Sequence, residues 1–162
     1  NLNMKINIIC AHINHNIREE SNDEAISLKS YCEKNNITFE MIKFDKKSAN
    51  NDYNELELRE KRYAFFYDIV KKYNAKYLFT AHHGDDLVET ILMRLTRGSS
   101  LKGYSGFSVL TNKGDFSIVK PLIYVTKDDI VKYCINNKLI YFEDKTNKED
   151  KYTRNRYRKY IV

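Results

Sequence analysis

The chain reads Thr80-Ala81-His82-His83-Gly84-Asp85-Asp86-Leu87-Val88-Glu89-Thr90 directly after the apolar run Tyr77-Leu78-Phe79. Apolar residues then recur at helical spacing from Leu87 to Leu95, so the pattern predicts a strand that turns into a helix. Open α/β sheets bind their ligands at such turns, and the unpaired N–H groups of the first helical turn favour anions. This stretch therefore predicts the mouth of a ligand site.

The segments around this turn alternate between strand and helix. Strands are expected at residues 5–13, 37–44, 76–80 and 116–120. Helices are expected at residues 19–35 and 55–73, from residue 85 onward, and after the cap Thr126. Residues 97–115 hold four of the five glycines and are predicted to be a loop. Short connections between alternating elements are typical of a doubly wound, mostly parallel sheet, so a Rossmann-like α/β fold is expected.

Length and composition indicate a single domain. The 162 residues can bury one hydrophobic core, and 42% of them are apolar and 31% charged, as in soluble globular proteins. No apolar run approaches the roughly 20 residues of a membrane span, so no membrane partner is expected. Three dispersed cysteines, Cys10, Cys32 and Cys134, fit a reducing cytoplasm and argue against a zinc ribbon. The formal charge of +6 is a mild hint of a polyanionic partner.

Four side chains of the opening stretch could carry chemistry, namely His82, Asp85, Asp86 and Glu89. Asp86 and Glu89 are three residues apart and would share one face of a helix. Carboxylates at this spacing suit Mg²⁺, or hydrogen bonds from an amino group of a substrate. The structural alternative is that the two aspartates cap the helix and that the histidine only packs. Spacing alone leaves both interpretations open.

The C-terminal residues, about 143–162, form a charged tail. Residues 151–160 hold five positive charges, three tyrosines and no acid. Arginine can grip phosphate and tyrosine can stack on unpaired bases, so RNA contact is one interpretation, and a solvated basic helix end is the other. Arg94 and Arg97, three residues apart on the helix after the acidic cluster, could add to an RNA-contacting surface.

A second polar group follows the first expected strand. His12, Asn14 and His15 lie at its end, and Arg18 comes soon after. Because the carboxyl ends of parallel strands share one edge of a sheet, these four residues are candidates for a nucleotide pocket. A histidine at a strand end is nevertheless more often structural than catalytic.

No glycine precedes Gly84, and the chain opens with Asn1. A nucleotide-binding α/β domain normally carries a glycine-rich phosphate loop after its first strand. We therefore expect the first strand and this loop to be missing, which leaves residues 1–162 a partial domain that is inactive alone. A missing strand would expose a sheet edge, so self-association, for example as a homodimer, is an expected risk.

Seven segments in order along the chain carry a family resemblance. They are His12 to Arg18, Arg59 to Phe66, Thr80 to Thr90, Arg97 to Gly103, Lys120-Pro121-Leu122, Glu143 to Asn147 and Arg154 to Arg158. Together they resemble the tRNA(Ile)-lysidine synthetases of the PP-loop ATP pyrophosphatase superfamily. Thr80 to Thr90 is similar to the family's His-x-x-Asp-Asp-x-x-Glu-Thr signature. Asn16 stands where the family often has glycine, which asparagine can replace in a left-handed conformation.

The resemblance implies a two-step reaction on tRNA(Ile) with a CAU anticodon. ATP would adenylate the C2 oxygen of the wobble cytidine and release pyrophosphate. The ε-amine of free L-lysine would then attack C2 and displace AMP, which leaves lysidine. ATP and Mg²⁺ are the implied cofactors.

The resemblance also implies roles for individual residues. Asp86 would organise Mg²⁺, and Glu89 would accept hydrogen bonds from the cytosine edge or the lysine amine. His82 and Asp85 would orient the pocket. The residues implied to contact RNA phosphate or the anticodon loop are Arg94, Arg97, Arg154, Asn155, Arg156 and Arg158.

The sequence leaves three alternatives open. One is another PP-loop tRNA modifier of the thiolase type, although the cysteines show no paired motif. Another is a non-catalytic RNA-binding module in which the acids merely cap a helix. The last is a metal-dependent phosphohydrolase built on His82, Asp85 and Asp86.

Overall fold

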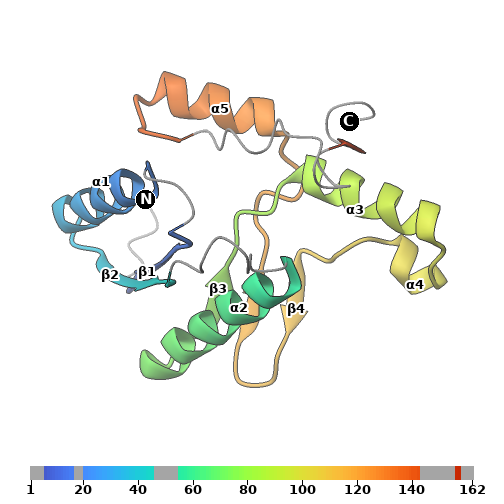
Figure 1. Cartoon of the computed structure of the whole chain (residues 1–162), viewed down its shortest axis with the longest axis horizontal. Helices are drawn as coiled ribbons and strands as arrows, with labels where there is room; N and C mark the ends of the chain where they lie inside the picture. The colour runs from blue at the N-terminus through green and yellow to red at the C-terminus, as the bar shows by residue number, and fades with distance from the viewer. Residues whose placement is uncertain (1–5, 17–19, 46–54, 143–155, 158–162) are drawn as a thin grey trace. The chain divides into compact units, whose positions relative to one another are not determined.

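The computed structural model describes residues 6–16, 20–45, 55–142 and 156–157 (Figure 1). The chain consists of two units, residues 1–75 and 76–162. Within the described ranges, no helix combines the length and the apolar character needed to cross a membrane.

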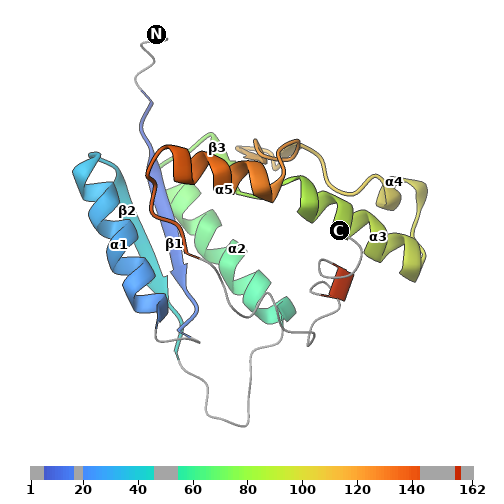
Figure 2. The same ribbon diagram turned by 90° about the horizontal axis from the view of Figure 1, so that it is seen from above.

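The first unit is a parallel strand pair with two helices. β1 (Ile9–Asn14) runs parallel to β2 (Thr38–Lys43) from the pair Ile9–Thr38 to the pair Asn14–Lys43. α1 (Glu20–Lys34) connects the strands and packs against both, and α2 (Glu55–Lys72) contacts β1 (Figure 2). These elements lie where the alternating pattern predicts them, although β1 begins four residues later than expected.

Asparagines supply the left-handed backbone of this unit. Asn16 has φ 54°, and its side-chain amide donates to the Phe44 carbonyl oxygen over 3.1 Å. The expectation that Asn16 takes a left-handed conformation is thus confirmed. Asn36 (φ 54°) and Asn74 (φ 47°) do the same just after α1 and α2, where helices commonly end in this conformation.

The second unit holds a three-stranded sheet in the order β3-β5-β4. β3 (Tyr77–Phe79) is parallel to β5 (Ser117–Val119), and β4 (Leu110–Asn112) is antiparallel to β5. α3 (Gly84–Arg97) follows β3, and α5 (Lys127–Asn136) follows β5. Thr126 accepts a hydrogen bond from the Asp129 N–H, which confirms it as the cap of α5. The parallel pairs β1–β2 and β3–β5 confirm the predicted α/β class.

The prediction of a loop over residues 97–115 is wrong in part. This segment contains the short helix α4 (Leu101–Tyr104) and the strand β4. The turn between β4 and β5 contains Gly114 (φ 87°), whose N–H donates to the Asn112 side chain over 2.7 Å. The helix α4 has four residues and the strand β4 has three. Both are too short to give a periodic signal in the sequence, so the pattern could not predict them.

Candidate functional site

The site begins where β3 ends and α3 starts. The Gly84 N–H donates to the Val125 carbonyl oxygen over 2.9 Å. A Cβ atom at Gly84 would come within 3.2 Å of that oxygen and within 3.4 Å of the Ile123 carbonyl oxygen. The close approach fixes the first turn of α3 against the segment that leads into α5.

Both aspartates of the first turn accept hydrogen bonds from helix starts. The Asp86 carboxylate accepts from the His83 N–H over 3.1 Å, at the N-cap of its own helix. The Asp85 carboxylate accepts from the Lys127 N–H over 2.9 Å and so caps the first turn of α5. The imidazole of His83 lies 3.5 Å from Asp86 Oδ2 and 3.7 Å from Asp85 Oδ2. The capping interpretation therefore describes part of what these acids do.

Glu89 differs from the aspartates because its side chain is completely buried, with 0% exposed. It lies one helical turn beyond Asp86 and shares a face of α3 with it, as the spacing predicts. Burying a carboxylate costs several kcal/mol unless partners compensate for the lost water. Glu89 has interaction partners in the protein, and its buried position on the face of α3 that carries Asp86 makes it a candidate for a functional role.

His82 is held from two sides within the second unit. Its Nδ1 lies 2.9 Å from the Thr80 hydroxyl, and its ring contacts Phe107 with 5.4 Å between ring centroids. Lys120 lies on the same phenyl ring, with Nζ 5.5 Å from its centroid, and is only 8% exposed. No pattern in the sequence predicts a role for Lys120. The available signal was a charged residue placed directly after a buried strand, within the motif Lys120-Pro121-Leu122.

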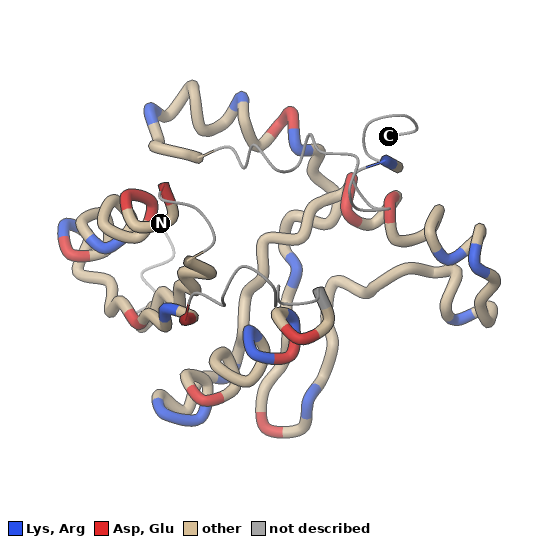
Figure 3. Tube along the Cα trace, viewed as in Figure 1, with Lys and Arg blue, Asp and Glu red and all other residues tan. Residues whose placement is uncertain are grey.

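Positive charge gathers at the other end of α3 (Figure 3). No acidic residue occurs from Thr90 to Gly114, whereas Arg94, Arg97 and Lys102 lie in this range. Asp86 and Arg97 are eleven residues apart on one helix, which corresponds to about 16 Å along its axis. The acids and the arginines therefore occupy opposite ends of α3.

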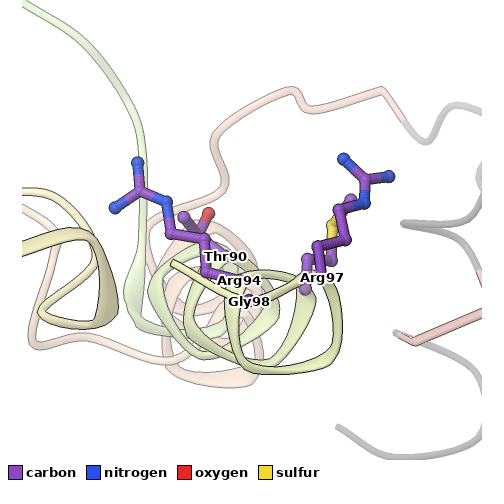
Figure 4. Close-up of a pocket in the computed structure, with 5 residues that line it drawn as sticks. Thr90, Arg94, Arg97 and Gly98 are labelled. Atoms are coloured by element: carbon purple, nitrogen blue, oxygen red, sulfur yellow. The ribbon is translucent and has the colours of Figure 1, made fainter. Parts of the chain in front are cut away.

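The two arginines differ in their contacts. One nitrogen of Arg94, Nη1, donates over 2.6 Å to each of the carbonyl oxygens of Gly103 and Gly106. Arg97 makes no hydrogen bond or ion pair with the part of the chain that the structure describes. Both line a hollow of about 220 Å³ together with Thr90, Met93 and Gly98. Figure 4 shows the two guanidinium groups leaving the end of α3 in diverging directions.

Two tail residues are described, Arg156 and Tyr157. The Tyr157 hydroxyl donates to the Thr96 hydroxyl over 2.7 Å, so the pair lies beside the last turn of α3. Thr96 is seven residues after Glu89 and therefore on the same face of the helix. Arg154, Asn155 and Arg158 lie outside the described residues, as do all the others of the tail except Arg156 and Tyr157.

The polar group of the first unit is partly structural. Asn14 is 2% exposed, and its amide donates to the Ser21 carbonyl oxygen (3.2 Å) and to Asn22 Oδ1 (3.1 Å). His12 stacks on Phe39 with 6.2 Å between centroids, and His15 packs edge-on against Phe44 at 5.4 Å. Burial lowers the pKa of His12, while the Glu24 carboxylate acts in the opposite direction. Arg18 lies outside the described residues.

A metal centre built by the protein alone is not found in the described ranges. They bring together no group of three or more His, Cys, Asp or Glu side chains that could hold a metal ion. Mg²⁺ commonly takes only one or two carboxylates and completes its shell with water and phosphate. Asp86 offers one carboxylate, which fits a Mg²⁺ site whose shell is completed by water and phosphate.

The cysteines of the first unit lie close together. The Cys10 thiol hydrogen bonds with the Cys32 thiol, although the two are far apart in sequence. Burial, and then the neighbouring Cys32, raise the pKa of Cys10 to about 11. Sulfur chemistry needs a thiolate, so the raised pKa makes Cys10 a poor nucleophile.

A comparison with protein families gives the class of protein. The family model of the PP-loop domain matches residues 1–162. The chain belongs to the PP-loop family.

Curated relatives narrow the resemblance to one kind of PP-loop protein. The tRNA(Ile)-lysidine synthase of Bacillus cereus is 42% identical over 159 residues, which cover 96% of this chain and 33% of that protein. The tRNA(Ile)-lysidine synthase of Staphylococcus aureus is 37% identical over 157 residues, 96% of this chain and 36% of that protein. The chain spans about a third of the length of these relatives. The resemblance predicted from the seven segments is confirmed.

A solved structure supports the fold. The U34-tRNA thiolase NcsA from Methanococcus maripaludis, solved with its [4Fe-4S] cluster, matches with a TM-score of 0.69. The match covers 85% of this chain and 48% of that chain at 17% identity. At this identity the similarity concerns the α/β architecture.

Proposed function

We propose that this chain is part of an enzyme that uses ATP to join lysine to the wobble cytidine of tRNA(Ile). The observation that carries the proposal is the fully buried carboxylate of Glu89, one turn beyond Asp86 at the start of α3. A buried carboxylate near the start of a helix that follows a sheet strand can accept hydrogen bonds from an amino group with little competition from water. The relatives named tRNA(Ile)-lysidine synthase support the choice of substrate.

The proposed reaction breaks one bond of ATP and forms a C–N bond. The C2 oxygen of the cytidine attacks the α-phosphorus and releases pyrophosphate. The lysine ε-amine then attacks C2, AMP leaves with the C2 oxygen, and the amine loses a proton. Mg²⁺, when bound, would neutralise charge on the departing pyrophosphate.

The residues at the start of α3 divide these tasks. Glu89 accepts hydrogen bonds from the cytosine edge or from the lysine amine. Asp86 would hold Mg²⁺ through its carboxylate, while His82 and Asp85 orient the pocket. Contact with the nucleotide stays a prediction for four residues of the first unit, His12, Asn14, His15 and Arg18. A cytoplasmic location and self-association as a homodimer also stay predictions.

The experiment uses the full-length gene product, ATP, lysine and a tRNA(Ile) transcript with cytidine at the wobble position. One AMP and one pyrophosphate should form for each lysidine, and a transcript with uridine at that position should give none. ATP turnover without lysidine would reject the proposal. The 162-residue chain alone, which has no glycine before Gly84, is expected to be inactive in this assay.

The thiolase alternative is disfavoured by the state of the thiols. Cys32 is 1% exposed, and the pKa of Cys10 is raised to about 11. Reactive cysteines instead have lowered pKa values and partial exposure. No described feature favours sulfur transfer over ligation.

Arg97→Ala is expected to weaken tRNA binding. Arg97 is exposed at the lip of the hollow and makes no hydrogen bond or ion pair within the described ranges, so its charge is available to a phosphate. Removing one phosphate contact should lower the slope of log affinity against log salt concentration by about 1. Filter binding at several salt concentrations measures the tRNA affinity and the slope of its dependence on salt. Lys113→Ala, an exposed cation between β4 and β5, is the matched control and should leave them unchanged. An unchanged slope for Arg97→Ala would remove this residue from the RNA surface.

A further inference from the structure

Lys120 lies at the same sheet edge as His82. β3 and β5 are parallel with Phe79 opposite Val119, and the Thr80 N–H donates to the Val119 carbonyl oxygen over 2.9 Å. Thr80 and Lys120 are thus the first residues after two neighbouring parallel strands. His82 follows two residues after Thr80, so the lysine and the histidine leave the sheet at the edge where ligands bind.

Lys120 fixes three consecutive residues before β4. Its N–H donates to the Val109 carbonyl oxygen over 2.8 Å, and its ammonium donates to the Ser108 carbonyl oxygen over 3.3 Å. The ammonium also lies 5.5 Å from the centroid of the Phe107 ring. The backbone and side chain of one residue therefore hold the segment Phe107-Ser108-Val109 at the end of β5.

Phe107, which Lys120 holds in place, also contacts His82. The two rings are 5.4 Å apart with an interplanar angle of 63°, an edge-to-face contact. Thr80 holds the Nδ1 side of the imidazole at 2.9 Å. The hydrogen bond with Thr80 and the ring of Phe107, which Lys120 contacts, both contribute to the orientation of His82.

The burial of Lys120 indicates that its charge has a use. Lysine is almost never fully buried unless it is paired, and Lys120 is only 8% exposed. Desolvating an ammonium costs several kcal/mol, so an apolar residue would fill this volume at lower cost. An ammonium can hold the face of an aromatic ring and a carbonyl oxygen at once, which a methionine cannot do.

We propose that Lys120 is a positioning residue for His82, acting through Phe107. The inference rests on the proposed function, because it gives the imidazole a task in lysidine formation. Lys120 itself need not touch a substrate. Its removal should leave the ring of Phe107 less restrained and the imidazole in several orientations.

The test is a double-mutant cycle of Lys120→Met and His82→Asn in the full-length gene product. Lys120→Met should lower kcat for lysidine formation on the order of 10- to 100-fold, because small misplacements of reacting groups have such effects. The KM for tRNA should change less than about threefold, since the variant alters none of the arginines proposed to bind RNA. Lys120→Arg, which keeps a cation over the ring, should restore most of the rate. Thermal unfolding of each variant excludes loss of the fold.

The second step of the cycle separates positioning from packing. In the His82→Asn background, Lys120→Met should change the rate by less than about twofold, because residues that act as a unit are not additive. Independent, multiplicative losses would overturn the inference. A His82→Asn variant with the wild-type rate would also overturn it and leave the proposed function standing. A wild-type protein that forms no lysidine would instead reject the proposed function.

Discussion

Glu89→Gln is expected to lower the rate of lysidine formation by about 10²- to 10⁴-fold in the full-length gene product. The carboxylate is completely buried in α3, and glutamine preserves its length and volume. A carboxylate only accepts hydrogen bonds, whereas the amide presents two donors on one side and carries no charge. The loss should therefore appear in kcat for the chemical step, with tRNA affinity unchanged.

Two controls distinguish a functional carboxylate from a structural one. Asp128→Asn removes an exposed acid from the first turn of α5 and should leave the rate unchanged. Glu89→Leu tests the apolar replacement that a purely structural site would tolerate, since replacing a buried charge by an apolar group is often neutral. Full activity of Glu89→Gln, measured as lysidine formed per enzyme and minute, would show that the proposed chemistry does not use this residue.

Much of the site could be predicted from sequence because its signals are local. Helix spacing places Asp86 and Glu89 on one face, and the polar end of an apolar strand marks the start of α3. Thr126 is a local capping signal for the same reason, since its partner Asp129 is three residues away. Such features depend only on residues close in sequence, so they can be recognised without knowledge of the tertiary fold.

The remaining features depend on contacts between distant residues. Asp85 caps α5 through the Lys127 N–H, forty-two residues away, which spacing cannot reveal. The contact of Lys120 with Phe107 requires the antiparallel pairing of β4 with β5, and β4 is only three residues long. The thiols of Cys10 and Cys32 meet only because α1 packs on β1. Sequence periodicity carries no information on such pairings.

Gly106→Ala is the second large effect expected, here on stability. Gly106 has φ +73°, a conformation that costs an L-residue about 1–2 kcal/mol. An added Cβ would also lie 2.4 Å from Leu87 Cδ1 and 3.2 Å from Ile91 Cγ1, on the apolar face of α3. Overpacking of this kind typically costs about 1–3 kcal/mol. The sum predicts that opening of α3, measured by hydrogen exchange of its amides, becomes about 2–5 kcal/mol easier.

Gly114→Ala isolates the backbone part of this effect. Gly114 has φ +87°, but an added Cβ there would meet no atom within 4 Å. It should therefore cost only the backbone strain, about 1–2 kcal/mol, and only in the hairpin between β4 and β5.

Equal losses in the two variants would mean that Leu87 rotates away and that α3 does not depend on close packing against Gly106. A larger loss in Gly106→Ala, accompanied by a lower rate of lysidine formation, would tie the packing of this loop to the site. The Gly106 carbonyl oxygen binds Arg94, and Phe107, the next residue, contacts His82, so one displaced loop would disturb both ends of α3.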